Sequence, residues 1–438
     1  MRRLKDFSIK EVNMKKQIPS YSNNGFYICD IDLGQGSKMS IATDTNANDY
    51  SEYLNRLTKS GYSFYADNKI GNNLYSTYVN DDYIINVMFI EAFAQTRVII
   101  DDRKTFSLPG LASENVYEDK GKNVLILLSD GAVGWPGRMG YAYKLADGSF
   151  FLIDGGYTET GPHGNSSGDC IVAALEKYAD DPSNIKIAAW LITHIHEDHF
   201  GGFLDMSLNE ELRQRITIEK LIYNEPSDME MLSHTKGRPA LLDWAKHFDA
   251  AVERWAPKQL IKAHPGQVFY LKNMTLTVYS SQDLILGAKD TNTGNYITSI
   301  PEHNDTSVVT KIDFMGKTAL YLADSCICAH RDVLDPVYNS ALKADILQVA
   351  HHGYGNTGGN YIYKYVEPSI VFWPVCRNHF WGRDVGYKEH GLVYIGVKDV
   401  GFNRILFKEG IKHFVHEEEC IVFEDFDTWD GTIWDAIP

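Results

Sequence analysis

Three imidazoles and one aspartate are crowded into six consecutive residues of this chain, His194-Ile195-His196-Glu197-Asp198-His199. Without a cation between them, such groups would carry a large cost of desolvation and mutual repulsion. Structural zinc sites favour cysteine ligands and a closed shell, and no cysteine lies near this segment. A cluster of nitrogen and oxygen ligands alone is typical of an open, catalytic site. The segment therefore predicts a metal centre that performs chemistry.

The motif follows an apolar run over Ile185–Ile192 that is typical of a buried strand. Side chains two apart in an extended chain point the same way, so we expect His194 and His196 to share one ion. The next pair, Asp198-His199, stands just before Gly201-Gly202, which would let the chain turn. We expect this pair to reach a second ion beside the first.

The spelling HxHxDH resembles the signature of the metallo-β-lactamase superfamily, and the resemblance covers roughly residues 120–385. It implies an α/β (α+β) fold class, namely a four-layer αββα sandwich with a two-metal site at one edge. Asp154 follows a predicted hairpin strand at Ser149–Ile153 and matches the first motif of the superfamily. The resemblance implies that Asp154 orients a metal ligand, as partners of metal-bound histidines generally do.

Two further apolar segments deliver candidate ligands at their ends. Asp324 follows Thr318–Ala323 and matches the fourth motif, in which one carboxylate bridges both metals. His351-His352-Gly353 follows another predicted strand and matches the fifth motif. The resemblance favours His351 as the ligand, whereas His352 is either the ligand instead or a contact to substrate. Asp198, Asp324 and His351 are accordingly predicted to be the catalytic ligands.

The third motif departs from the lactamase pattern, in which a histidine ligand precedes a small-residue turn. His303 stands at the right distance before Ser307 to be that ligand. The segment Asn304-Asp305-Thr306-Ser307 is equally similar to the Asn-rich motif of the ComEC competence-protein hydrolase domain and related choline-phosphate esterases. We place the chain in that subgroup, with Asn304 and Ser307 supporting the site or contacting substrate. The role of His303 stays open, because water could complete the shell of the first metal instead.

The resemblance implies a two-metal hydrolase whose nucleophile is a metal-bridging hydroxide. Two ions can hold the nucleophile and stabilise developing negative charge together. Zinc is favoured, although sites of nitrogen and oxygen ligands also accept manganese or iron. The subgroup favours a phosphodiester as substrate, small or nucleotide-like. Arg377 would suit its anionic group by bidentate bonding, and a surface salt bridge is the equal alternative for this residue. A lactam, lactone or thioester hydrolase, or a non-catalytic metal-binding assembly protein, is the alternative.

Composition sets the wider limits. A formal net charge of −16 argues against general nucleic-acid binding, which needs a basic face. No apolar run approaches the roughly 20 residues of a membrane span, and no apolar segment of a signal peptide follows the basic start. The six cysteines have no framework spacing, so no disulfides are implied. We expect a cytoplasmic enzyme with a small, anionic substrate; the oligomeric state is not predicted.

Residues 1–110 are predicted to form a small α+β accessory domain, and residues 120–438 the metallo-β-lactamase-like domain. The accessory domain shows a helix capped near Asn48-Asp49 and short strands between Lys38 and Ile100. It carries no motif with chemistry, so docking and oligomerisation remain conceivable. Farther along, Leu212–Ile218 and Ala240–Trp255 are predicted helices.

Overall fold

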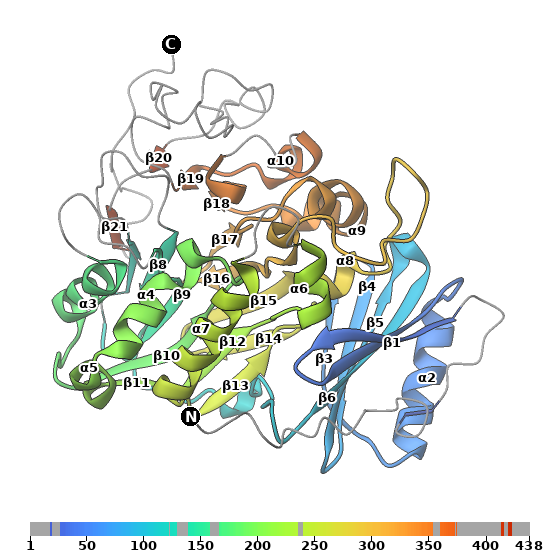
Figure 1. Ribbon diagram of the computed structural model, residues 1–438, viewed down its shortest axis with the longest axis horizontal. Helices are drawn as coiled ribbons and strands as arrows, with labels where there is room; N and C mark the ends of the chain where they lie inside the picture. Colours follow the sequence, from blue (N-terminus) through green and yellow to red (C-terminus); the bar gives the residue numbers. More distant parts are fainter. Residues whose placement is uncertain are drawn as a thin grey trace.

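The computed structural model contains three β-sheets with helices packed against them (Figure 1). The residues that the structure describes are 18–19, 27–121, 123–128, 139–157, 166–234, 240–353, 360–372, 374, 413–415 and 419–422. Within these residues, no helix is both long and apolar enough to cross a membrane.

The first sheet is antiparallel and has the strand order β1-β2-β6-β5-β4-β3. Its strands are β1 Tyr27–Gly34, β2 Ser37–Ala42, β3 Ser63–Ile70, β4 Asn73–Val79, β5 Tyr83–Ile90 and β6 Gln95–Asp102. Helix α2, Ala47–Lys59, covers one face through Tyr50, Tyr53 and Leu57. Its N-cap is Asn46, in a capping box with Asp49, so the cap lies two residues before the predicted Asn48. The sheet lies inside the predicted unit 1–110, and β1 lies in a segment that the sequence patterns left without structure.

The second and third sheets are stacked face to face. The second sheet has the order β13-β12-β10-β9-β8-β7-β21, and β11 also pairs with β10; the third has the order β14-β15-β16-β17-β18-β19-β20. The second sheet comprises β7 Val124–Leu127, β8 Gly140–Lys144, β9 Phe150–Asp154, β10 Ile185–Leu191, β11 Ile216–Ile218, β12 Lys220–Tyr223, β13 Gln259–Lys262 and β21 Glu419–Val422. The third comprises β14 Val268–Leu271, β15 Met274–Ser280, β16 Val309–Phe314, β17 Lys317–Tyr321, β18 Ile346–Gln348, β19 Ile370–Phe372 and β20 His413–Val415.

Both stacked sheets are covered by helices on their outer faces. The side chains of β9 alternate between two hydrophobic cores. Phe151 and Ile153 pack between the two sheets, whereas Phe150 and Leu152 pack under the helices. Over the second sheet lie α3 Ser167–Tyr178, α4 Glu197–Leu208, α5 Glu210–Arg215 and α7 Leu241–Trp255. Over the third lie α8 Gln282–Ile285, η4 Ala329–Leu334, α9 Asp335–Tyr338, η5 Asn339–Leu342 and α10 Asn360–Val366. The expected fold class, an α/β (α+β) four-layer αββα sandwich with a small α+β unit before it, is confirmed by these sheets and helices.

One predicted helix is only half right. The helix expected over Leu212–Ile218 ends at Arg215, and Ile216–Ile218 forms β11, which pairs in parallel with β10. The reason is that Ile-Thr-Ile is β-branched throughout and fits a sheet edge better than a helix. The helix expected over Ala240–Trp255 is confirmed as α7.

Candidate metal centre

Four strands from the two stacked sheets end at the same edge, and each carries a candidate site residue at its end or shortly after it. Strands β9 and β10 run parallel in the second sheet, as do β17 and β18 in the third. The carboxyl ends of such strands meet at one edge, where open α/β sheets place their sites. The residues delivered there are Asp154, His194, His196, Asp324, His351 and His352.

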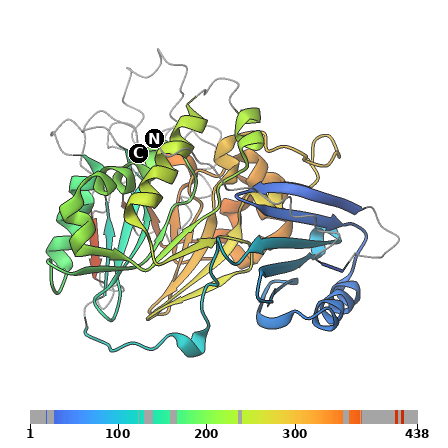
Figure 2. The ribbon, with the colours of Figure 1, turned by 60° about the horizontal axis from the view of Figure 1, so that its bottom comes forward.

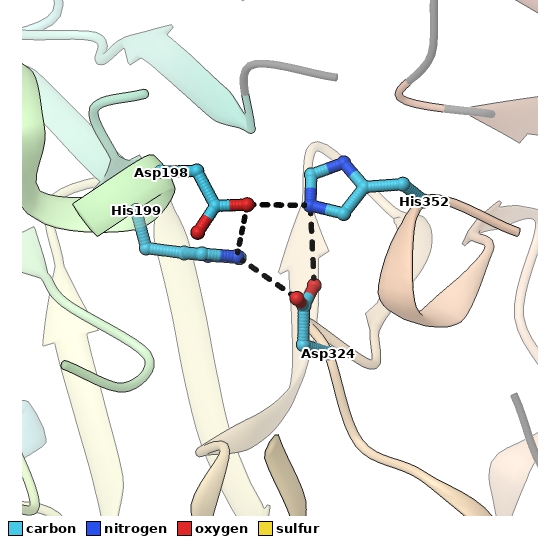
Figure 3. A group of neighbouring side chains, drawn as sticks. All are labelled: Asp198, His199, Asp324 and His352. Atoms are coloured by element: carbon cyan, nitrogen blue, oxygen red, sulfur yellow. Dashed lines mark ion pairs between the residues drawn. The ribbon is translucent and has the colours of Figure 1, made fainter. Parts of the chain in front are cut away.

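One group of four side chains converges from both sheets: Asp198, His199, Asp324 and His352 (Figure 3). One ligand atom from each lies within 4.8 Å of the others. Nε2 of His352 lies 3.3 Å from Asp198 Oδ2 and 3.6 Å from Asp324 Oδ1, while Nε2 of His199 lies 3.2 Å from Asp324 Oδ2. Two imidazoles and two carboxylates that face one point form a suitable shell for a divalent cation.

A second group shares one carboxylate with the first. His194 and His196 meet Asp324, again with the ligand atoms within 4.8 Å of one another. His194 Nε2 lies 3.1 Å from His196 Nδ1 and 3.9 Å from Asp324 Oδ2. The expectation that the first two histidines of the motif converge agrees with this geometry. The arrangement therefore offers two neighbouring cation sites that meet at Asp324.

Asp198 and His199 reach the centre from a helix, which the sequence patterns did not predict. Helix α4 begins at Glu197, so both residues lie in its first turn. The glycine pair expected to turn the chain lies inside this helix. Gly202 N donates to Gly155 O over 3.0 Å, and a Cβ on Gly202 would lie only 2.4 Å from that oxygen. The missing side chain allows α4 to approach the end of β9 closely.

Asp154 sets the orientation of His199. Its carboxylate accepts the N–H and the hydroxyl of Thr193, at 2.8 and 2.9 Å, and lies 2.8 Å from His199 Nδ1. When Nδ1–H is donated to Asp154, Nε2 of His199 points to Asp324 and keeps a lone pair that can bind a cation. Thr193 was not among the predicted site residues, although it stands directly before the motif.

The protonation states of the centre are set by burial and by the close approach of its carboxylates and imidazoles. Burial alone would raise the pKa of Asp324, but the imidazoles of His199, His352 and His351 hold it below its usual range. Burial would lower the pKa of His199, but Asp324, Asp154 and Asp198 raise it well above the usual value. Without a bound cation, protonated imidazole must therefore supply the positive charge that these carboxylates need.

Two buried atoms show that the group fits a cation. Nε2 of His199 and Oδ1 of Asp324 make no hydrogen bond within the described part of the chain, although both are shielded from solvent. Burial and the neighbouring His199 and His196 lower the pKa of His194 well below its usual value, which leaves a neutral imidazole able to bind metal. Buried polar atoms normally have partners, and a divalent cation would supply them here.

The structure separates the two histidines of the fifth motif. His352, not the favoured His351, belongs to the four-residue group. Nε2 of His351 lies 3.8 Å from Asp324 Oδ2 and 3.0 Å from Nδ2 of Asn304. Both histidines have left-handed backbones, with φ of 46° and 52°, as does Ala323 before the shared carboxylate with φ of 49°. Such strained backbones persist where surrounding structure holds them, often at functional sites.

The third motif forms the short helix η3, His303–Thr306, beside the centre. The ring of His303 is buried and its centroid lies 4.8 Å from that of His196, yet His303 belongs to neither candidate group. Ser307 Oγ accepts the backbone N–H of Asp324 over 3.2 Å. Both residues therefore adjoin the centre, and whether His303 binds metal stays a prediction. Arg377 lies outside the described residues.

Asp305 is a supporting residue that the sequence did not single out. It is buried, and its Oδ1 accepts the N–H groups of Cys326 and Ala329 over 2.8 and 3.0 Å. This ties η3 to the loop that carries Asp324. Burial raises the pKa of Asp305 to about 7. An aspartate in an Asn-Asp-Thr-Ser turn usually caps its own turn, so nothing in the sequence signals this distant partner.

No protein-family model matches the chain, and no curated protein matches it. Among solved structures, the chain is similar to CmlA, a diiron beta-hydroxylase from Streptomyces venezuelae, with a TM-score of 0.40 and 12% identity over 69% of this chain and 54% of that one. It is also similar to MEM-A1, a subclass B3 metallo-beta-lactamase from a soil metagenome library, with a TM-score of 0.27 and 18% identity over 54% of this chain and 81% of that one. The chain thus spans about half the length of CmlA. At these scores the likenesses decide nothing about activity, and the fold rests on the sheets and cores described above.

Proposed function

We propose that this protein is a two-metal-dependent hydrolase. The observation that carries the proposal is the meeting of two candidate ligand groups at one carboxylate, Asp324. The first ion would be held by His194, His196 and Asp324. The second would be held by Asp324 with three further side chains, namely Asp198, His199 and His352. His352 thereby takes the ligand role that the fifth motif alone assigned to His351.

When bound, two divalent ions would make water a stronger acid and would stabilise negative charge on the reacting group. The protein's own contribution is to hold the ligands in place before substrate arrives. Asp154 orients His199, and Ser307 fixes the backbone of Asp324. The His351 side chain is 13% exposed, against 2% for His352, so we propose that His351 faces the substrate while His352 binds metal.

The proposed substrate class is a phosphodiester, small or nucleotide-like, with zinc as the metal. The support is the likeness of Asn304-Asp305-Thr306-Ser307 and His351-His352-Gly353 to the motifs of phosphodiester-cleaving relatives. The contact between Asn304 and His351 places a neutral amide and an imidazole side by side at the centre. In this contact Nδ2 donates to Nε2, and the second N–H of the Asn304 amide can donate to a phosphoryl oxygen.

Elemental analysis followed by a substrate panel tests the proposal. We expect about two equivalents of metal per chain, with preferred turnover of bis(p-nitrophenyl) phosphate or a phosphorylcholine ester over a chromogenic lactam and a thioester. Preferred turnover of the lactam or thioester would overturn the phosphodiester assignment. If the protein binds metal but hydrolyses no substrate, and the iron-loaded protein consumes dioxygen, the hydrolase proposal is wrong and the protein is an oxidative enzyme.

A further inference from the structure

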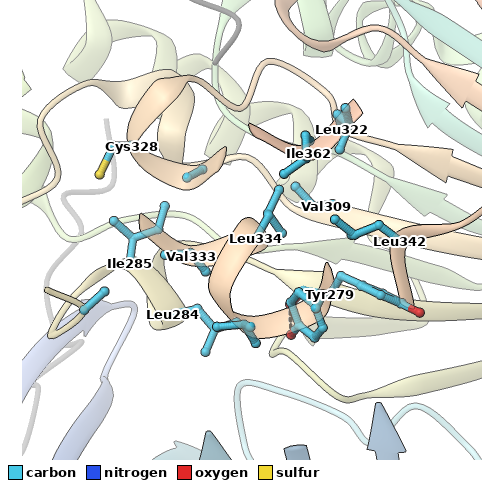
Figure 4. Packing of buried hydrophobic residues seen from close by; sticks show 14 of the residues in the cluster. Tyr279, Leu284, Ile285, Val309, Leu322, Cys328, Val333, Leu334, Leu342 and Ile362 are labelled. Atoms are coloured by element: carbon cyan, nitrogen blue, oxygen red, sulfur yellow. Dashed lines mark hydrogen bonds between the residues drawn. The ribbon is translucent and has the colours of Figure 1, made fainter. Parts of the chain in front are cut away.

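The first sheet is built into the side of the αββα sandwich. Figure 2 shows its blue strands packed beside the orange elements of the third sheet and its helices. Met39, Ile41 and Ile99 of the sheet share one buried core with Leu284 and Ile285 of α8. In Figure 4 these two α8 residues extend among the apolar side chains of η4. The sheet therefore covers α8 directly, with α2 on its other face.

Two glycines show how closely the two units approach. A Cβ on Gly266 would lie 2.1 Å from ring atoms of Tyr75, and one on Gly287 would lie 2.2 Å from Cδ1 of Ile41. Both glycines have positive φ, at 88° and 80°. Any other residue at these positions would push the first sheet away or strain the backbone. The contact is thus a packed core and not a loose docking surface.

A buried histidine bridges the two units, and we name Asp101, His264 and Asp283 the interface cluster. His264 Nε2 donates to Asp101 Oδ2 of β6 over 2.8 Å, and His264 Nδ1 donates to Asp283 Oδ2 of α8 over 2.6 Å. The three residues are at most 2% exposed. Both ring nitrogens meet carboxylates, so the ring is an imidazolium. Burial would lower the pKa of His264, but the two carboxylates raise it to about 9.

The neighbouring polar groups also join the two units. Arg97 of β6 donates from Nη1 to the carbonyls of Asp283 and Leu286, at the end of α8. Lys262 of β13 donates from Nζ to the carbonyls of Leu33 and Gly34, over 2.7 and 2.8 Å. The carbonyl groups at the end of α8 are thus capped by a side chain of the first sheet.

Helix α8 in turn contacts η3, the short helix beside the metal centre. This short helix carries His303 and Asn304. From η3, Asp305 binds the N–H groups of Cys326 and Ala329, and Ser307 accepts the N–H of Asp324. A continuous series of buried contacts therefore runs from β6 to the carboxylate shared by the two candidate sites.

We propose that the first sheet is a positioning element of the metal centre. The interface cluster holds α8, and α8 holds η3 in the position from which Asp305 and Ser307 fix the loop of Asp324. This gives residues 27–102 a role that goes beyond the proposed hydrolase activity. Asp101, His264 and Asp283 are positioning residues in this scheme, since none of them belongs to a candidate metal group.

Hydrogen exchange of the metal-free full chain tests the proposal without reference to substrate or metal. Asp101→Asn keeps the size of the side chain but removes the charge opposite the His264 imidazolium. We expect amide exchange over residues 281–288 and 303–308 to become about ten-fold faster or more, because local opening there becomes easier. Exchange over β10 should stay unchanged. The imidazole NMR signals of His303 should shift as well, since they report the position of η3.

Unchanged exchange over 303–308 overturns the proposal. An equal rise over β10 also overturns it, because the cluster would then only stabilise the whole chain. Should Asp101→Asn fail to fold, Ser37→Ala removes only the hydrogen bond donated to Asp101 over 2.5 Å. Exchange should then become faster over the same two segments, by a smaller factor, and stay unchanged over β10.

The matched control is Glu219→Gln, which removes an ion pair with Lys258 at 2.8 Å between side chains that are 36% and 60% exposed. It should leave exchange over both segments unchanged. Hydrogen exchange is measured without metal or substrate. If the protein turned over none of the substrates, the hydrolase proposal would be wrong, but the exchange data would still test the positioning role of the first sheet.

Discussion

Two buried histidines each place their two ring nitrogens against different carboxylates: His199 in the metal centre and His264 under the first sheet. The distances are similar: 2.8 and 3.2 Å from the nitrogens of His199 to its partners, and 2.6 and 2.8 Å from those of His264. All of these groups are shielded from solvent. Residue types and distances alone therefore do not distinguish the two sites.

The surroundings of the carboxylates do distinguish them. At the interface cluster, Asp101 also accepts from Ser37, and Asp283 also accepts from Asn224 and Ser281. Arg97 and Lys262 lie close by and add positive charge, so the carboxylates have full partners. A closed network of this kind holds structure together.

The metal centre, in contrast, is an open site, because it contains buried polar atoms that have no hydrogen-bond partner among the described residues. His199 Nε2 and Asp324 Oδ1 make no hydrogen bond among the described residues, and further ligand atoms from His194 and His352 point to the same carboxylate. The lesson is that satisfied partners identify a structural histidine, whereas converging ligand atoms without hydrogen bonds identify a place for a cation.

The most damaging change to the open site should be Asp324→Ala. It removes the ligand shared by both groups, so we expect less than one metal equivalent per chain and a loss of turnover on the order of 10²–10³-fold. Elemental analysis and the rate on the preferred substrate measure both. If the variant holds two metals and full activity, Asp324 is not the shared ligand.

The closed site should respond in stability and not in metal content. We expect His264→Ala to lower the free energy of unfolding by about 3–5 kcal/mol, because two buried carboxylates lose their common partner. Urea unfolding of the metal-free protein provides the measurement. A loss below about 1 kcal/mol, the level of an exposed ion pair, would contradict the closed network.

The closed site should also make stability depend on pH in one direction. The folded pKa of His264 is about 9, above its ordinary value of 6.5, so its contribution is complete below pH 6.5 and is lost as pH rises through 9. The contribution amounts to roughly 3 kcal/mol by linkage. The difference in unfolding free energy between the parent and His264→Gln, followed from pH 6 to 10, should shrink over this range. If the difference instead grew with pH, the pKa of His264 would be lowered by folding, and the ring would not be an imidazolium in the folded protein.

The smallest effect should separate two adjacent histidines. His352→Ala should lose one metal equivalent and about 10²-fold in rate, whereas His351→Ala should keep both metals and weaken only catalysis. Metal content at matched protein concentration decides between them. Loss of metal in His351→Ala with retention in His352→Ala would restore the assignment made from the motif alone.

Much of the site was predictable because four of its candidate ligands lie within six residues of the chain. The crowding of His194, His196, Asp198 and His199 needs a cation in any fold, and apolar strands before Asp324 indicated that it would reach the same edge. The choice within His351-His352 was not predictable. Two consecutive left-handed residues, His351 and His352, lie inside η6, Ala350–Gly353, and their φ and ψ decide which ring faces Asp324.

The sequence by itself indicated the cluster of metal ligands, because that cluster follows from local residue types, and the αββα layers were implied by the resemblance of its motifs. Only the tertiary structure decided what the first sheet does. Asp101, His264 and Asp283 are far apart in the chain and each is unremarkable in its own segment. Their charges become compatible with burial only when three elements bring them within hydrogen-bonding distance, a condition that depends on the complete packing of both units.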